Sequence, residues 1–126
     1  MVMRTPLKTV RYLGSAKEGA DHFWKQRLTG VANVFLGLFL VWLIASLIGS
    51  DYLTVKAKLA NPLIAMPLLA LVVSATVHMR LGMQTIIEDY VHGEGAKIVL
   101  LMLNTFFSAF VALSSMFAIL KISFGA

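Results

Sequence analysis

The sequence contains no cysteine. This absence excludes disulfide bonds, iron–sulfur clusters held by thiolates and haem attached through cysteine in this chain. Charged residues are also scarce, at 13% of the 126 residues, whereas about 25% is usual for soluble domains. With 59% hydrophobic residues and a mean hydropathy of +0.83, the composition indicates a membrane protein.

Long uncharged runs divide the chain. There are three of them: 28–50, 59–79 and 98–120. Each run is long enough for a membrane-spanning helix, which needs about 20 apolar residues. We therefore predict an all-α membrane protein with three transmembrane helices, at about 30–49, 62–90 and 96–120.

Local signals set the limits of the second predicted span. Asn61 followed by Pro62 is typical of an N-cap and the first helical position. Pro67, about a turn and a half further on, is expected to kink the helix slightly. Nothing breaks the helix before Gly93, so it should continue to about Tyr90. We predict that residues 50–61 form a loop.

The first 29 residues are predicted to form a cytoplasmic and interfacial segment, separate from a transmembrane unit at 30–126. Ser15 and Glu18 fit the capping-box pattern at the start of a helix. Hydrophobic residues then recur at helical spacing, with Trp24 as an interfacial aromatic. This pattern predicts a short interfacial helix that runs into the first span.

The distribution of lysine and arginine predicts the orientation in the membrane. Eight of these eleven residues lie in the N-terminal flank or at the edges of the loop between spans two and three. Short cytoplasmic loops are enriched in Lys and Arg, so we expect a cytoplasmic N-terminus. The net charge of +5 then reflects topology and attraction to anionic lipid headgroups. No basic face indicates a nucleic-acid partner.

Small and polar residues share one face of the second predicted span. At about 100° per residue, Ser74, Gly82, Thr85 and Asp89 fall within about 40° of His78 on a helical wheel. Small and ionisable residues within a membrane turn toward a partner helix or a cavity. We therefore expect His78 to face inward. Three helices offer few partners within one chain, so we expect another subunit to cover this stripe.

His78 is the histidine set among the membrane-spanning residues. An ionisable residue in that place is a functional hypothesis, and a neutral imidazole hydrogen-bonded to another helix is the structural alternative. Imidazole is a usual axial ligand of haem iron, and Gly82 leaves space for a flat ligand. One histidine supplies one axial position, so a second ligand would come from a partner.

Arg27, Asp89 and Tyr90 are candidate binding residues near the cytoplasmic surface. The Arg27 guanidinium either extends to lipid phosphates or turns inward to pair with an acidic group through two hydrogen bonds. The Tyr90 phenol can donate to a carbonyl, with Asp89 beside it. A quinone needs such a donor near the interface, where its ring receives protons. An ordinary interfacial tyrosine beside a solvated acid is the alternative.

These residues resemble a known family in their combination. The pattern His78-x3-Gly82-x6-Asp89-Tyr90 lies on the second of three spans, and Gln26-Arg27-Leu-Thr29 precedes it at the entrance to the first. The chain is similar in this respect to the small hydrophobic membrane-anchor subunit of succinate dehydrogenase, the D-type anchor of respiratory complex II. The resemblance extends from His22 through the third span.

The resemblance implies specific roles. It implies that His78 is one of two axial histidine ligands of a haem b, the other coming from a larger cytochrome b-type anchor subunit. It implies that Tyr90 binds ubiquinone with Asp89 nearby, and that Arg27 contacts the haem propionates. It also implies an iron–sulfur subunit and a flavoprotein subunit as partners. Electrons from succinate, in the tricarboxylic acid cycle, would pass through these two subunits to the quinone.

The same resemblance implies a multi-pass protein of the bacterial inner (cytoplasmic) membrane that is not catalytic by itself. A haem-free structural anchor, as in some fumarate reductases, is the alternative. A transporter component is a third hypothesis, but ionisable groups do not line a path through the spans. Arg80 and His92 do not match the pattern and receive no role.

Overall fold

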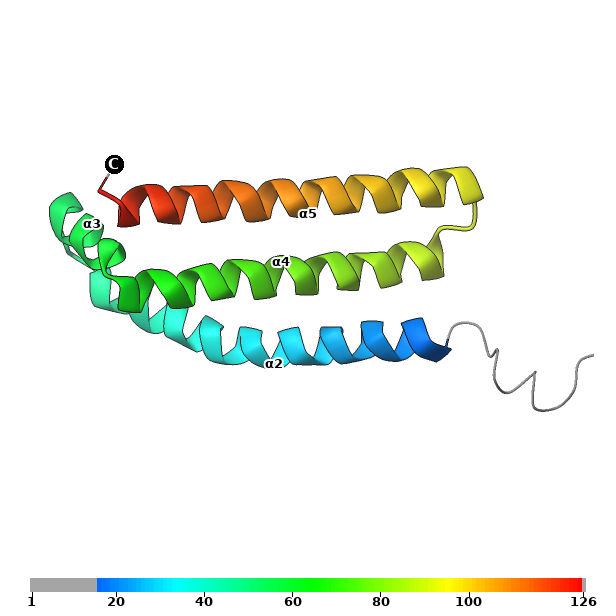
Figure 1. Cartoon of the computed structure of the whole chain (residues 1–126), viewed down its shortest axis with the longest axis horizontal. Coiled ribbons are helices and arrows are strands. Elements are labelled where there is room, and N and C mark those ends of the chain that lie inside the picture. The colour runs from blue at the N-terminus through cyan, green and yellow to red at the C-terminus, as the bar shows by residue number, and fades with distance from the viewer. Residues whose placement is uncertain (1–15, 126) are drawn as a thin grey trace, which may run out of the picture.

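A computed structural model describes residues 16–125, and these residues fold into helices without any strand (Figure 1). In chain order the helices are α2 (Ala16–Leu47), α3 (Tyr52–Ala60), α4 (Pro62–Tyr90) and α5 (Glu94–Ser123). By length and composition, three of them are able to cross a membrane: α2, α4 and α5. The predicted fold class and number of spans are confirmed.

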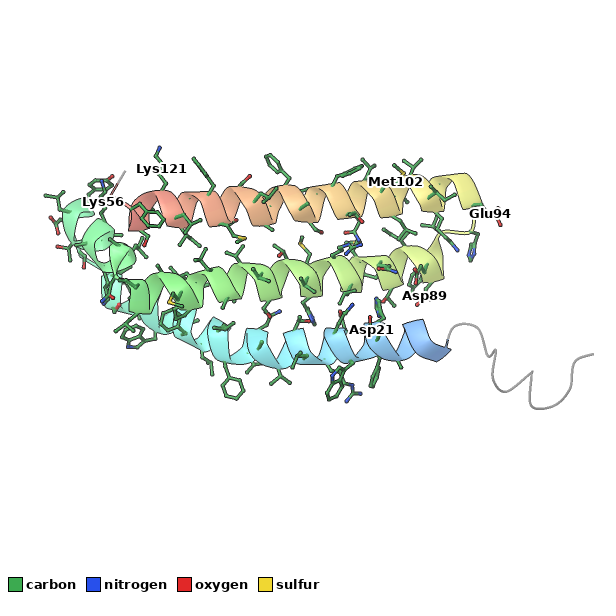
Figure 2. All side chains as sticks on the ribbon, in the orientation of Figure 1. Asp21, Lys56, Asp89, Glu94, Met102 and Lys121 are labelled. Carbon is green, nitrogen blue, oxygen red and sulfur yellow. The ribbon has the colours of Figure 1, made fainter. Side chains whose placement is uncertain are left out.

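Helix α4 lies in the middle of the bundle. It packs against α2 on one side and against α5 on the other, and the three long helices run side by side (Figure 1). Figure 2 shows Asp21, Asp89 and Glu94 at one end of the bundle and Lys56 and Lys121 at the other. Charged groups therefore mark both ends, as expected where helices leave the hydrocarbon.

Helix α4 has the predicted bounds. Its N-cap is Asn61, whose side chain accepts a hydrogen bond from the Leu63 amide at 3.0 Å, and Pro62 occupies the first turn. Proline fits there because the amide that it lacks would be unpaired anyway. Pro67 lies inside the helix, which continues without interruption to Tyr90.

Helix α2 is longer than the predicted first span. The expected interfacial helix and the span form one unbroken helix from Ala16 to Leu47. The proposed boundary between residues 29 and 30 therefore falls within a helix. Ser15, the proposed capping residue, lies outside the described residues.

The prediction of a loop at 50–61 was wrong, because residues 52–60 form helix α3. Asp51 is its N-cap and accepts a hydrogen bond from the Thr54 amide at 3.3 Å. Hydrogen bonding to Thr54, chiefly through its side chain and also through its amide, lowers the pKa of the Asp51 carboxyl from its usual value of 3.8. A cap of this kind stabilises the start of a helix, and the sequence analysis did not consider Asp51 in that role. The Asn61 amide then closes α3 by donating to the Lys58 carbonyl.

The bundle exposes large apolar side chains, as a membrane protein does. Phe35, Phe106 and Phe110 are 69%, 64% and 70% exposed, and few apolar side chains are buried. Lipid is as apolar as these side chains, so outward-facing phenylalanines carry no penalty there. The interior seams instead contain buried hydroxyls at Ser74, Thr76 and Ser108.

Candidate functional site

His78 lies on the side of α4 that packs against α2. Its Nδ1 atom is 3.1 Å from the Thr29 hydroxyl and 3.2 Å from the Gln26 carbonyl oxygen. The side chain is partly buried between the two helices. The expectation that His78 faces inward is therefore confirmed.

These contacts determine which ring nitrogen carries the proton. A carbonyl oxygen only accepts hydrogen bonds. The Thr29 hydroxyl has a single proton, which it donates to the Lys25 carbonyl at 2.7 Å, so toward His78 its oxygen accepts. The Nδ1 atom must then be the donor to both groups. In a neutral imidazole this leaves the Nε2 lone pair free to accept a proton or to bind a metal.

The stripe around His78 faces α2 of the same chain. Ser74 donates to the Thr29 carbonyl at 3.2 Å. A Cβ atom added at Gly30 would lie 3.4 Å from His78 Cε1, and one at Gly82 would lie 3.4 Å from the Gln26 amide nitrogen. Within the chain, α2 thus supplies partners for Ser74, His78 and Gly82, whereas Thr85 and Asp89 of the predicted stripe are exposed. The space at Gly82 lies against the Gln26 amide.

Helix α2 carries polar groups that the sequence analysis did not single out as site residues. Three side chains of α2 each have a buried atom without a hydrogen-bond partner among the residues that the structure describes: His22 Nε2, Gln26 Oε1 and Asn33 Oδ1. Their spacing of four and seven residues puts them on one side of the helix. The signal was present in the sequence, but it became informative only once α2 was known to lie beside His78.

Arg27 does not reach His78. Its guanidinium carbon lies 4.4 Å from the centre of the Phe23 ring, and the side chain is exposed. This is a cation–π contact within one turn of α2. Among the described residues, no hydrogen bond or ion pair occupies the guanidinium donors, which lie at the surface of the bundle.

Asp89 and Tyr90 end helix α4. Tyr90 is 77% exposed, and Asp89 is exposed as well, at the end of the bundle that also holds Asp21 (Figure 2). Twelve residues of helix separate Tyr90 from His78, or about 18 Å along the axis. The structure therefore places Asp89 and Tyr90 away from His78, and Arg27 does not contact His78 either.

Within the described part of the chain, no three His, Asp or Glu side chains gather as a set of metal ligands. The arrangement instead offers one imidazole with a fixed tautomer. In a histidine that binds a metal through one ring nitrogen, the other ring nitrogen typically donates to a backbone carbonyl, and this bond orients the ring. The residues present therefore fit a single axial ligand. Fold and site together define the class: a multi-pass membrane protein in which one imidazole is held between two of the spans.

Comparisons with known proteins agree with this class. Residues 1–113 match the family described as "Succinate dehydrogenase/Fumarate reductase transmembrane subunit". The chain therefore belongs to this family, as a membrane anchor subunit of succinate dehydrogenase. As a member of such a complex it associates with other subunits. No solved structure gives a significant match.

Curated relatives carry the same description. The succinate dehydrogenase hydrophobic membrane anchor subunit of Rickettsia bellii is 34% identical over 88 residues, which cover 70% of each chain. The one from Paracoccus denitrificans is 28% identical over 122 residues, covering 97% of this chain and 94% of the relative. The succinate dehydrogenase membrane anchor subunit of Reclinomonas americana is 31% identical over 86 residues, covering 66% and 72%.

Proposed function

We propose that this anchor subunit supplies one axial ligand of a haem b through His78 Nε2, and that the larger cytochrome b-type anchor subunit supplies the other. The observation that carries the proposal is the pair of contacts at Nδ1 with the Gln26 carbonyl and the Thr29 hydroxyl. In a neutral imidazole they leave the Nε2 lone pair free, and they hold the ring in place. The haem supplies one-electron redox chemistry when bound.

The remaining residues of the chain position the imidazole. Thr29 is itself fixed by its bond to the Lys25 carbonyl, and Gly30 allows the ring to approach α2 closely. Arg27 is proposed to pair with a haem propionate, because the side chain is exposed and, among the described residues, its guanidinium contacts an aromatic face and no acidic group. A guanidinium donates two parallel hydrogen bonds to a carboxylate.

We also propose that Tyr90 donates a hydrogen bond to ubiquinone, with Asp89 beside it to accept or pass protons. The exposure of Tyr90 at the end of α4 supports this role. A quinone ring at that level meets the aqueous surface, while its tail stays in lipid. The electrons come from succinate through the flavoprotein and iron–sulfur subunits, which dock on this side of the bacterial inner membrane. The chain contributes binding and orientation and does not oxidise succinate itself.

The haem proposal is tested by a reduced-minus-oxidised absorption spectrum of the purified complex. We expect His78→Ala to lose the b-type bands while the complex stays assembled. Met79→Ala, one residue along and 37% exposed, is the matched control and should keep them. Unchanged bands in His78→Ala would refute ligation and leave the alternative, a haem-free structural anchor of the fumarate reductase type.

The quinone proposal is tested by comparing two electron acceptors. Tyr90→Phe removes the phenol but keeps the ring. We expect it to reduce quinone reduction strongly, and to change succinate oxidation by a soluble dye little. If both activities fell together, the residue would act in assembly and the quinone role would be wrong.

A further inference from the structure

Arg80 lies on the α5 side of helix α4, away from His78, because two residues along a helix are separated by about 160°. The Arg80 Nε atom donates to the Thr105 hydroxyl of α5 at 3.3 Å, and the Asn104 amide of α5 donates to the Arg80 carbonyl at 2.9 Å. These two bonds hold Arg80 at the seam between α4 and α5, with its side chain exposed. The haem and quinone roles proposed above do not use it.

Arg80 lies at the level of charged residues on the neighbouring helix α2. The residues two positions before and two positions after Arg80 both lie beside Gln26 of α2, so Arg80 is level with Gln26. The sequence neighbours of Gln26 are Lys25 and Arg27, and both are exposed. Exposed lysine and arginine side chains on a membrane-spanning helix mark the level of the lipid headgroups.

The helix lengths agree with this level. Arg80 directly follows the uncharged run 59–79. Eighteen residues separate Pro62, the first residue of α4, from Arg80, and eighteen separate Thr105 from Ser123, the last residue of α5. Each interval corresponds to about 27 Å of helix, close to the thickness of the hydrocarbon core of about 30 Å. With the far end of the bundle at one membrane surface, Arg80 therefore lies at the other.

A groove between α4 and α5 leads from Arg80 toward the middle of the membrane, and its volume is about 210 Å³. Its lining on α5 changes with depth: Thr105 lies at the outer end, Ser108 one turn deeper, and Ala109 and Ala112 follow. Ser108 is only 4% exposed, and its hydroxyl has no hydrogen-bond partner among the described residues. The groove thus presents a cation first, then an unpaired hydroxyl, then small apolar side chains.

Among the described residues, no carboxylate pairs with Arg80, and no hydrogen bond occupies its terminal Nη groups. The first acidic residue after it on α4 is Glu88, about 12 Å further along the helix, which accepts a hydrogen bond from Gln84 at 2.9 Å. The Nη groups of an arginine form a planar fork that fits two oxygens of a phosphate. Phosphate is the anion that every phospholipid carries at this level of the membrane.

We propose that this groove binds one phospholipid of the leaflet nearest Tyr90. Its phosphate accepts two parallel hydrogen bonds from Arg80, and one acyl chain lies along Ala109 and Ala112. The ester carbonyls of a phospholipid lie just below its phosphate, so one of them accepts from the Ser108 hydroxyl. A carboxylate from a helix of another subunit would pair with Arg80 alone and leave the buried Ser108 hydroxyl unpaired. The inference goes beyond the proposed function and uses neither the haem nor the quinone.

Photolabelling of the assembled complex tests the occupant. The probe is phosphatidylglycerol with a photoreactive diazirine in its acyl chain, added in small excess to the complex purified in detergent. We expect label on Ala109 and Ala112, which line the groove. Leu113 and Phe117 are 68% and 69% exposed and do not line the groove, so they should carry only background label.

Competition identifies the source of the phosphate. Unlabelled phosphatidylglycerol should displace the probe from the groove, and millimolar inorganic phosphate should not. Displacement by inorganic phosphate would mean a site for a free anion and would overturn the proposal. Equal label on Ala109 and Phe117 would mean bulk lipid only, and an unlabelled groove would mean that a helix of another subunit covers it. Either result would overturn the proposal as well.

Substitutions test the two polar contacts. Arg80→Gln should lower the labelling of the groove by roughly tenfold, because two charge-assisted hydrogen bonds are lost, and Arg80→Lys should retain more, because an ammonium keeps the charge. Ser108→Ala should lower it by roughly threefold, the effect of one neutral hydrogen bond. Lys121→Gln, which removes a cation at the other end of α5, is the control and should label as wild type does. Wild-type labelling of Arg80→Gln would refute the phosphate contact.

A second variant tests the acyl chain independently of the charge. Ala112→Phe fills the inner end of the groove, keeps Arg80 and should also lower the labelling. Unchanged labelling in an assembled Ala112→Phe complex would refute the path of the chain, whatever the fate of Arg80→Gln.

The haem spectrum separates this inference from the proposed function. Assembled Arg80→Gln complex should keep its b-type bands, because His78 lies on the other side of α4, and loss of the bands would place Arg80 at the haem and overturn the inference. A His78→Ala complex should still label at Ala109, whether or not His78 binds haem. Loss of that label would tie the groove to the haem and refute a separate lipid site.

Discussion

Replacing Thr29 with valine removes one of the two acceptors of the His78 Nδ1 proton and keeps the shape of the side chain. The hydroxyl lies 3.1 Å from Nδ1, and the Gln26 carbonyl at 3.2 Å remains as the second acceptor. A neutral hydrogen bond contributes about 0.5 to 1.5 kcal/mol net. Since one acceptor survives, we expect a loss near the middle of that range, about 1 kcal/mol, which corresponds to roughly fivefold weaker haem binding.

The assay is a haem titration of the complex purified from haem-depleted cells, followed by absorbance. Thr29→Ser keeps the hydroxyl and is the matched control, so its affinity should stay close to that of wild type. Two results would refute the reasoning. An unchanged affinity in Thr29→Val would mean that the hydroxyl does not hold the ring. A complete loss, as expected for His78→Ala, would mean that the carbonyl of Gln26 cannot hold the ring by itself.

Three further predictions concern other contacts. Gly30→Ala should keep the haem, because the added Cβ would lie at an ordinary contact distance of 3.4 Å from His78 Cε1. Gly30→Leu should lose the haem, as measured by the b-type absorption bands. Gly37→Leu is the control, because the space around Gly37 is open. The pKa of the Asp51 carboxyl is lowered in the folded protein. Its cap therefore stabilises α3 at pH values above the usual pKa of 3.8, and this stabilisation is lost as the pH falls through the lower pKa of the folded state. Hydrogen exchange of the Thr54 amide should report this loss, and Asp51→Asn should remove the pH dependence. The Lys58 ammonium donates a hydrogen bond to the Ser46 hydroxyl at 2.7 Å and lies 5.2 Å from the centre of the Trp42 ring. Lys58→Met should therefore lower the free energy of unfolding in detergent by up to about 1 kcal/mol. Lys56→Met, the control, should change it less.

The spans were predictable from sequence because charged side chains carry the largest cost of insertion into a membrane. Where runs such as 98–120 lack charged residues, a helix across the hydrocarbon is the arrangement that satisfies the backbone. The limits of α4 were also local, since Asn61 and Pro62 set its start. The short helix α3 depends on one capping aspartate, and so weak a signal was missed.

The environment of His78 was only partly predictable. Helical spacing gave the face of α4 on which it lies. It did not give the register between α2 and α4, because that depends on where the chain re-enters the bundle after α3. Gln26, Thr29 and Gly30 therefore could not be assigned to the imidazole from sequence, although all three are visible in it.

The two sequence-based interpretations of His78, a hydrogen-bonded structural residue and a ligand, do not exclude each other. No water is available within the hydrocarbon to satisfy the second nitrogen of an imidazole, so a membrane histidine that binds iron through Nε2 must donate its Nδ1 proton to protein. The bonds to Gln26 and Thr29 meet that requirement within the chain. The helix contact is thus a condition for ligation, and a variant that breaks it should weaken haem binding without moving His78 to another face of α4.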